Sequence, residues 1–415
     1  MPISRAWIVP LFLLAAVICS GRAEAAEAGE VRVEADFPGG NIVVQRLASD
    51  TVWVAPDLRD TQAKQWWFYW NFRLRAPAGR PVNVVFTDRN PLGVRGPALS
   101  IDGGKTWRWL GAAAVAAQKV DGRPTWSFVA EVPAGATDVR YAFCPQYLED
   151  HLQAWRKKHE GHPALRLGEL ARSRQGRAVE LIRAGCLDAA KSRGVVLLTA
   201  RHHCCETMAS YALEGWLEAV LAEDDLGRRW RSNWEVRAAP FMDKDGVEAG
   251  DQGKNRTPHD HNRDYNAEPR YPEVAAMMQL GGEIGRRVVA AVDLHCPHIR
   301  GEWNDRVYLV GSPEAAVWQG QTGFAAVLER VQEGTIRFRA ADCLAYGTAW
   351  NTANNTRQGR SFGGWATTAF PEARLVTTIE IAYADALGAE VNATSARALG
   401  RDLARALAEF LAAER

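Results

Sequence analysis

Two patterns of hydrophobic and polar residues divide the chain. From about residue 31 to residue 143, short alternating segments such as Val82-Asn83-Val84-Val85-Phe86 are broken by Gly, Pro and Asp. Repeated short strands with turn signals are typical of an antiparallel β-sandwich. Farther along, apolar runs of strand length alternate with segments of helical spacing, which predicts an α/β domain with a mixed central sheet. We therefore expect a β-sandwich over residues 30–146 and an α/β domain over residues 147–415.

The same periodicities place the elements of the α/β domain. Strands are expected near residues 195–200, 235–239, 288–294, 306–310 and 374–381, and helices near residues 206–223, 272–287, 313–331 and 394–413. An amphipathic helix from Tyr147 to Lys158 is expected to connect the two domains. In the sandwich, the aromatic run from Trp66 to Trp70 is expected to fill the core and the domain contact, because alternate side chains of a strand point inward.

Candidate metal ligands stand where predicted strands end. His203 and Glu206 follow the apolar run that ends at Ala200, and their spacing of three puts both side chains on one side of a first helical turn. An imidazole and a carboxylate held like this are zinc ligands. His295 ends a second apolar strand, and catalytic zinc sites typically have three protein ligands. His202 with Cys205 is a competing pair of the same spacing.

The charge balance excludes one class of partner, and the N-terminal segment predicts a cellular compartment. The 50 basic and 49 acidic residues nearly balance, so no nucleic-acid partner is indicated. Arg5, the short apolar stretch that follows it and the small residues around Glu24 predict a signal peptide over residues 1–26. The mature chain would then be periplasmic or secreted, with no transmembrane span. In an oxidising compartment Cys296 could pair with Cys204 or Cys205, and buried free thiols are the alternative.

Several motifs, in the same order, resemble those of the zinc metallocarboxypeptidases of the carboxypeptidase A-like family, and more closely its cytosolic carboxypeptidase branch. The matching segments are Ser173–Leu181, Arg201–Thr207, Lys244–Val247, Asp260–Tyr265, Asp293–His295 and Thr377–Glu380. The resemblance covers almost everything from about residue 30 onward, and it also implies a β-sandwich before the peptidase domain.

The resemblance implies a zinc-dependent peptidase that removes C-terminal residues from peptides or proteins. One zinc ion per chain would be held by His203, Glu206 and His295. It would activate a water molecule, with Glu380 as the general base.

Further residues match the family's substrate contacts. Asn262 and Arg263 would bind the terminal carboxylate of the substrate, because a guanidinium matches a carboxylate in a bidentate manner. Asp260 would accept a hydrogen bond from the far nitrogen of His203 and fix its tautomer. The family also has an arginine that stabilises the oxyanion, and here Gly253 stands at that position. Lys254 or Arg256 is left to supply the positive charge.

Other assignments stay open. Tyr346, Tyr383 and Trp365 all remain candidates for the residue that caps the substrate. Arg357 or Arg360, in the polar stretch before the Glu380 strand, could recognise an acidic side chain as deglutamylating relatives do; surface arginines are the alternative. Two other functions also fit the sequence. One is a zinc amidase or peptidase acting on cell-wall peptides or isopeptide-linked branches, and the other is a non-catalytic peptide-binding relative.

Overall fold

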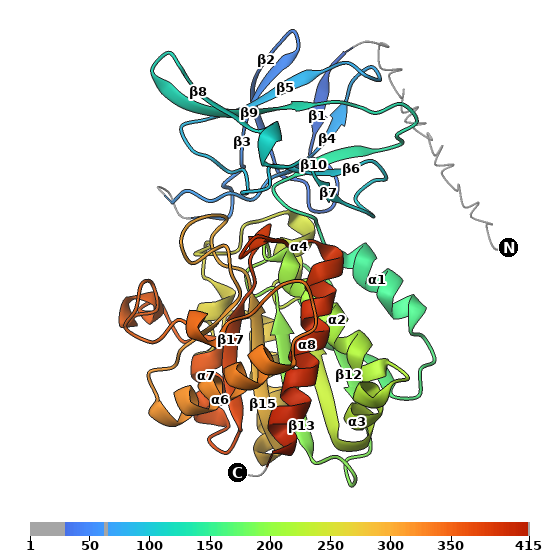
Figure 1. Cartoon of the computed structure of the whole chain (residues 1–415), viewed down its shortest axis with the longest axis vertical. Coiled ribbons are helices and arrows are strands. Elements are labelled where there is room, and N and C mark those ends of the chain that lie inside the picture. The colour runs from blue at the N-terminus through green and yellow to red at the C-terminus, as the bar shows by residue number, and fades with distance from the viewer. Residues whose placement is uncertain (1–29, 62–64, 414–415) are drawn as a thin grey trace, which may run out of the picture.

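The computed structural model describes residues 30–61 and 65–413. Two lobes lie one above the other along the long axis of the molecule (Figure 1). The sheet lobe contains β1 to β10, and the α/β lobe contains the elements from α1 onward. Within the described ranges, no helix has both the length and the hydrophobicity needed to cross a membrane.

The sheet lobe consists of two five-stranded sheets. The first, in spatial order, is β1 (Arg32–Glu34), β4 (Asn71–Arg75), β10 (Val139–Ala142), β6 (Ala98–Ser100) and β7 (Arg108–Trp109). The second is β2 (Val43–Ala48), β3 (Thr51–Ala55), β5 (Val82–Thr87), β9 (Arg123–Ala130) and β8 (Ala116–Val120). Neighbouring strands pair antiparallel except β3 and β5, which pair in parallel.

The aromatic run before β4 is buried but is not a strand. Phe68, Tyr69 and Trp70 are at most 3% exposed, and they lie in a hydrophobic core that continues into the α/β lobe. The backbone N–H groups of Phe68 and Tyr69 donate to the side-chain oxygen of Gln252, over 3.2 Å and 2.9 Å. Because this side chain of the α/β lobe satisfies both donors, the segment binds the two lobes together without pairing in a sheet.

A seven-stranded mixed sheet forms the centre of the α/β lobe. Its spatial order is β11 (Leu165–Arg172), β12 (Ala178–Gly185), β14 (Trp234–Ala239), β13 (Gly194–Ala200), β15 (Val288–His295), β17 (Leu375–Glu380) and β16 (Tyr308–Val310). The four strands from β14 to β17 pair in parallel, and the outer pairings are antiparallel. A small hairpin of β18 (Asp385–Ala386) and β19 (Ala389–Glu390) follows.

Helices cover both faces of this sheet. The α-helices are α1 (Glu149–Lys158), α2 (Thr207–Leu221), α3 (Asp225–Asn233), α4 (Lys244–Ala249), α5 (Pro272–Ile284), α6 (Ala315–Val331), α7 (Phe362–Ala369) and α8 (Ala393–Ala412). Short 3₁₀ turns cover Ala112–Ala114, His261–Arg263, Gly285–Arg287, Ala340–Asp342 and Ala353–Thr356. Residues of α2, α6 and α8 pack in the same core as the sheet lobe, whereas residues of α5 and α7 form a second core.

The central strand β13 shows why its sequence is apolar throughout. Val196 and Leu198 lie in the first core, and Val195 and Leu197 lie in the second. Since alternate side chains of a strand point to opposite faces, a strand covered on both sides needs an uninterrupted apolar run. The predicted fold class, an N-terminal antiparallel sandwich followed by an α/β domain with a mixed sheet, is confirmed.

Candidate metal centre

Two histidines converge on one glutamate at the carboxyl edge of the central sheet. His203 and Glu206 lie in the turn between β13 and α2, and His295 is the last residue of β15. Nδ1 of His203 lies 2.9 Å from Oε1 of Glu206, and Nδ1 of His295 lies 2.8 Å from Oε2. Because β13 and β15 are adjacent parallel strands, their ends bring residues distant in sequence to one point.

The turn after β13 is held by a buried arginine. Arg201 has a φ of 62°, in the left-handed region that few side chains adopt. Its guanidinium donates to the carbonyl of Tyr147 and to the hydroxyl of Ser210, both over 2.9 Å. These bonds offset the strained backbone and fix the position from which His203 projects.

The three side chains have the donor set of a metal site. One atom from each of His203, Glu206 and His295 lies within 4.8 Å of the others. Oε2 of Glu206 is buried and accepts no hydrogen bond, although an imidazole nitrogen lies 2.8 Å away. Burial alone would raise the pKa of Glu206. The positive charges of Lys254 and the two imidazoles outweigh this effect and hold the pKa well below its usual range. A buried, charged carboxylate with one imidazole nitrogen beside each of its oxygens fits a divalent metal ion.

Carboxylates behind both histidines orient their rings. Nε2 of His203 lies 3.3 Å from Oδ2 of Asp260, and Nε2 of His295 lies 2.7 Å from Oδ2 of Asp293. Each carboxylate favours a proton on Nε2 and thereby leaves Nδ1 free to bind a metal. The role of Asp293 was missed in the sequence, although its place two residues before His295 on one strand puts both side chains on the same face.

His202 belongs to a neighbouring hydrogen-bonded chain. Its Nδ1 lies 2.8 Å from Oδ1 of Asp293, and its Nε2 lies 2.7 Å from the hydroxyl of Tyr265. His202, Asp293 and His295 also lie close enough to form a metal-binding group, but both nitrogens of the fully buried His202 already have partners. In the competing pair, the thiol of Cys205 accepts from Gln252 over 3.0 Å, so His202 and Cys205 have separate partners.

Glu380 ends β17 directly beside His295. The two residues are partners in the parallel register of β15 and β17. Glu380 is 7% exposed, and its Oε2 is buried without a hydrogen-bond partner. Burial raises the pKa of this carboxyl group, in spite of the nearby charges of Lys254 and His295. A carboxylate with a free oxygen and a raised pKa suits a residue that accepts and returns a proton.

Asn262 and Arg263 stand in the 3₁₀ turn His261–Arg263. The amide nitrogen of Asn262 lies 3.1 Å from Nε2 of His295. The guanidinium of Arg263 donates to the backbone and side-chain oxygens of Asn355, over 2.9 Å and 3.0 Å. Both residues line the same cavity as His203 and Glu380.

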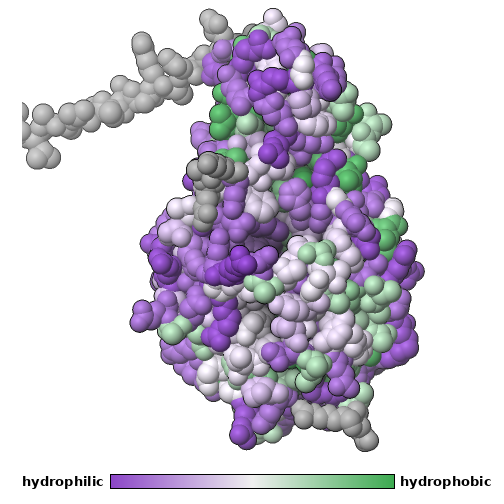
Figure 2. All heavy atoms as spheres, turned by 90° about the vertical axis from the view of Figure 1, so that its left-hand side faces the viewer, coloured by the Kyte–Doolittle hydropathy of each residue, from purple (hydrophilic) through white to green (hydrophobic). Residues whose placement is uncertain are grey.

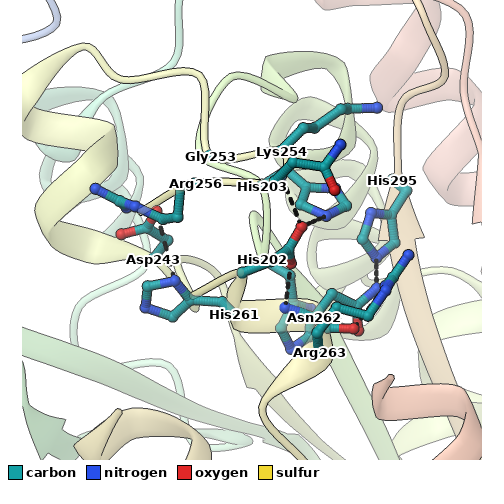
Figure 3. Close-up of polar contacts among 12 residues, drawn as sticks. His202, His203, Asp243, Gly253, Lys254, Arg256, His261, Asn262, Arg263 and His295 are labelled. Atoms are coloured by element: carbon teal, nitrogen blue, oxygen red, sulfur yellow. Dashed lines mark hydrogen bonds and ion pairs between the residues drawn. The ribbon is translucent and has the colours of Figure 1, made fainter. Parts of the chain in front are cut away.

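The structure separates the two candidates for the positive charge. The ammonium of Lys254 lies 2.8 Å from Glu206 and lines the cavity. The guanidinium of Arg256 pairs with Asp243 and, over 2.8 Å, with Asp251, and Arg256 does not line the cavity. Figure 3 shows Arg256 turned toward Asp243 and His261, away from His295. Of the two, only Lys254 is placed to act on a bound substrate.

A cavity of about 620 Å³ is lined by residues of both lobes, among them His203, Lys254, Asn262, Arg263, His295 and Glu380. Figure 2 shows the surface hollowed, among hydrophilic residues, just below the junction of the lobes. The sheet lobe supplies Trp67, a residue that sequence reasoning assigned to packing. The α/β lobe adds Tyr346 and Trp350, both partly exposed at the cavity.

The other residues considered for capping the substrate or recognising an acidic side chain do not line the cavity. The Tyr383 hydroxyl lies 3.3 Å from the thiol of Cys205, and Trp365 is buried in the second core. Arg357 is exposed, and neither it nor Arg360 lines the cavity. The cysteines in the described ranges, with the candidate pair partners Cys204, Cys205 and Cys296 among them, are all free thiols.

No family model matches the chain, but curated proteins do. Cytosolic carboxypeptidase 6 of Caenorhabditis elegans is 24% identical over 293 residues, which is 64% of this chain and 62% of that protein. Cytosolic carboxypeptidase 2 of Xenopus tropicalis is 28% identical over 163 residues, 36% of this chain and 16% of that protein. The chain thus spans less than two thirds of the length of the curated relatives it matches.

Solved structures match over nearly the whole chain. A metallo-carboxypeptidase from Burkholderia cenocepacia has a TM-score of 0.74 at 20% identity, covering 92% of this chain and 99% of that one. A metallo-carboxypeptidase from Pseudomonas aeruginosa has a TM-score of 0.71 at 21% identity, covering 92% and 99%. At such identity these similarities establish the fold.

The predicted periplasmic or secreted location is contradicted by the relatives, which are cytosolic carboxypeptidases and point to the cytosol. The signal peptide expected over residues 1–26 lies outside the described residues. The prediction rested on Arg5, the short apolar stretch that follows it and the small residues around Glu24, a pattern read from composition alone.

The fold agrees with that of the solved metallo-carboxypeptidases. The seven-stranded mixed sheet places His203, Glu206 and His295 together, from the motifs that resembled the family in sequence. In sequence the chain is similar to curated cytosolic carboxypeptidases, and its fold is that of the solved metallo-carboxypeptidases.

Proposed function

We propose that the chain is a zinc-dependent carboxypeptidase that removes single residues from the free C-terminus of peptides or proteins. One observation carries the proposal: Nδ1 of His203 and Nδ1 of His295 converge on Glu206 in the same cavity as the unpartnered carboxylate of Glu380. This arrangement combines a metal-binding group with a proton acceptor.

His203, Glu206 and His295 would hold one zinc ion. Two imidazoles and a carboxylate form a typical catalytic zinc set, which leaves a further position open. Zinc bound there would act as a Lewis acid toward the scissile carbonyl and a water molecule. Asp260 and Asp293 would keep both rings in the metal-binding tautomer.

The remaining side chains have separate tasks. Asn262 and Arg263 would bind the substrate's terminal carboxylate, which makes the enzyme an exopeptidase. Glu380 would take a proton from the attacking water and pass it to the leaving amine, so that its carboxylate is regenerated in each cycle. Lys254 would stabilise the negative charge that develops on the carbonyl oxygen.

We also propose that residues 30–146 form the sandwich domain and residues 147–415 the catalytic domain. The sandwich would close one side of the cavity, since Trp67 lines it. The contact through Gln252 and the shared core support a fixed arrangement of the two domains.

Peptide digestion tests the proposal directly. A library of peptides with different last residues is incubated with the full chain, with chelator, and with chelator followed by zinc. Mass spectrometry should detect loss of one C-terminal residue that the chelator abolishes and zinc restores. Matched peptides with an amidated C-terminus should stay intact, because they lack the carboxylate for Arg263. If metal is bound but no free C-terminus is shortened, the carboxypeptidase proposal is wrong.

A further inference from the structure

The floor of the cavity lies between β17 and α7, next to the proposed carboxylate anchor. Val376 and Thr378 precede Glu380 by four and two residues, so all three side chains point to one face of β17. The backbone N–H of Phe362 donates to the side-chain oxygen of Asn262 over 2.9 Å, which fixes the start of α7 beside the anchor.

Close packing completes this floor. A Cβ atom at Gly363 would lie 3.4 Å from the hydroxyl oxygen of Thr378, so α7 begins directly against β17. We define the floor by Ser361, Gly363, Thr367, Val376 and Thr378, all of which line the cavity. With its carboxylate on Asn262 and Arg263, a bound terminal residue would direct its side chain into this floor.

The floor offers hydroxyl groups and apolar surface but, among its five residues, no charge. The hydroxyl of Thr367 donates to the carbonyl of Gly363 over 2.9 Å, and that of Ser361 accepts from Gly364 over 3.1 Å. Each hydroxyl oxygen keeps further bonding capacity for a neutral polar group.

In the adjacent wall, Gln321 lines the cavity and its side-chain amide is engaged by the protein. The side-chain amide of Gln321 accepts from the N–H of Ser312 over 2.9 Å and donates to the carbonyls of Val310 and Val376 over 3.1 Å and 3.0 Å. Both N–H groups of the Gln321 amide are thus used within the protein, and Gln321 stabilises this wall.

The arginines suggested for an acidic substrate lie outside the cavity lining. Arg360 donates to the carbonyl of Tyr265 over 2.8 Å and to the hydroxyl of Thr368 over 3.2 Å. Arg357 is exposed. The lysine and arginine that do line the cavity are Lys254, which is paired with Glu206, and Arg263, which the terminal carboxylate would occupy.

A second carboxylate in the floor would therefore have no cation of its own, and it would lie beside Glu380. Removing a carboxylate from water without a partner is costly, whereas an amide or hydroxyl could bond to the threonines. We propose that this cavity selects peptides that end in an uncharged residue and rejects terminal Glu and Asp. This inference rests on the proposed function.

Matched peptides test the selectivity. Pairs that differ only in the last residue, Gln against Glu and Asn against Asp, are compared by kcat/KM with the zinc-loaded full chain. The neutral member should be better by at least about 100-fold, because leaving a buried polar or charged group without a partner costs on that scale. Equal or faster release of Glu would overturn the inference and leave the proposed function intact. No release from any peptide of a full set would overturn both.

Variants on α7 locate the floor. Thr367→Lys adds a cation to the floor and should shift the Glu-to-Gln ratio of kcat/KM toward Glu at least about tenfold, because it supplies the missing partner. Thr368→Lys is the matched control, since Thr368 is exposed and outside the cavity lining. It should leave the ratio as in the parent chain. A ratio that is unchanged in folded Thr367→Lys would show that the terminal side chain lies elsewhere, which would overturn the inference.

Discussion

The ammonium nitrogen of Lys254 lies 2.8 Å from Oε1 of Glu206, and it also donates to the backbone carbonyl of Cys296 over 2.7 Å. Lys254 is thus a partly buried cation that faces the metal-binding group and lines the cavity. Its position suits a group that stabilises negative charge on the substrate carbonyl, which is the task we propose for it.

Replacing this lysine should reduce catalysis more than substrate binding. In Lys254→Met, kcat should fall by about 10²–10³-fold, the usual effect of removing one group that stabilises an oxyanion. Lys254→Arg, which keeps the charge, should recover part of the loss. Steady-state kinetics together with zinc content provide the measurement. A normal kcat in Lys254→Met would show that the charge comes from elsewhere.

Glu380 can be tested without disturbing the metal ligands. In Glu380→Gln, kcat should fall by about 10²–10⁴-fold, because an amide cannot take up the proton, and zinc should still bind. Glu302→Gln is a matched control, since Glu302 also lines the cavity but is exposed. It should lower kcat far less. Equal effects of the two changes would contradict the role of Glu380.

The carboxylate behind His295 should control metal affinity. Asp293→Asn should weaken zinc binding by about 10–100-fold, because the amide no longer favours the tautomer with Nδ1 free. Thr199→Val is the matched control. It removes the 2.8 Å hydrogen bond that the Thr199 hydroxyl donates to the same carboxylate and a 3.5 Å contact with the carbonyl of Val292. Because the carboxylate itself is kept, the effect should be much smaller. Competition with a chromophoric chelator measures both affinities.

The strongly periodic parts of the fold could be predicted from the sequence. The helix expected near residues 206–223 is α2 (Thr207–Leu221), and the strand expected near 288–294 is β15 (Val288–His295). Short elements were missed. The helices α4 and α7 contain glycine in their first turns, and side-chain caps from Asp243 and Ser361 stabilise them where intrinsic propensity does not.

The metal ligands could be predicted from the sequence more readily than the positive charge that faces them. The spacing of three predicted that His203 and Glu206 lie close together, but they lie in a turn before α2 and not in its first helical turn. In that turn the backbone N–H of Glu206 donates to the carbonyl of His203 over 3.2 Å. Lys254 and Arg256 lie in a loop, where no helical or strand periodicity indicates the direction of a side chain. Gly253 and Asn255, on either side of Lys254, have φ values of 82° and 50°, so the chain turns between the two cations and sends them to different surroundings.

Arg256 should matter for stability. Its guanidinium pairs with the carboxylates of Asp243 and Asp251, and burial raises the pKa of Asp251 to about 6. Arg256→Met removes the guanidinium from Asp243 and leaves Asp251 with only Arg59, whose Nε lies 3.1 Å away. Breaking this buried arrangement should cost about 3–5 kcal/mol of unfolding free energy. The loss should be smaller at pH 5 than at pH 8, because protonation relieves the unpaired charge. Denaturant unfolding at both pH values checks this, with Arg256→Lys as the control that keeps the charge.

Asp138 gives a separate pH dependence, in the sheet lobe. Burial alone would raise the pKa of its carboxyl group. Hydrogen bonds from Arg73 and Arg140 outweigh this effect and lower the pKa to about 2. The bonds from Arg73 are 2.8 Å and 2.9 Å long, and that from Arg140 is 3.0 Å.

Because the folded pKa of Asp138 lies below the unfolded value, its stabilising contribution is present above about pH 4 and is lost as the pH falls toward 2. Asp138→Asn should therefore lower the unfolding temperature at neutral pH, and the difference from the parent chain should narrow below about pH 4. Asp50→Asn is the control, since the Asp50 side chain is 56% exposed in its pair with Arg80 and such pairs contribute little. Thermal unfolding followed by circular dichroism between pH 7 and pH 3 measures the difference. A gap between parent and Asp138→Asn that is constant over this range would contradict the assignment of the lowered pKa to Asp138.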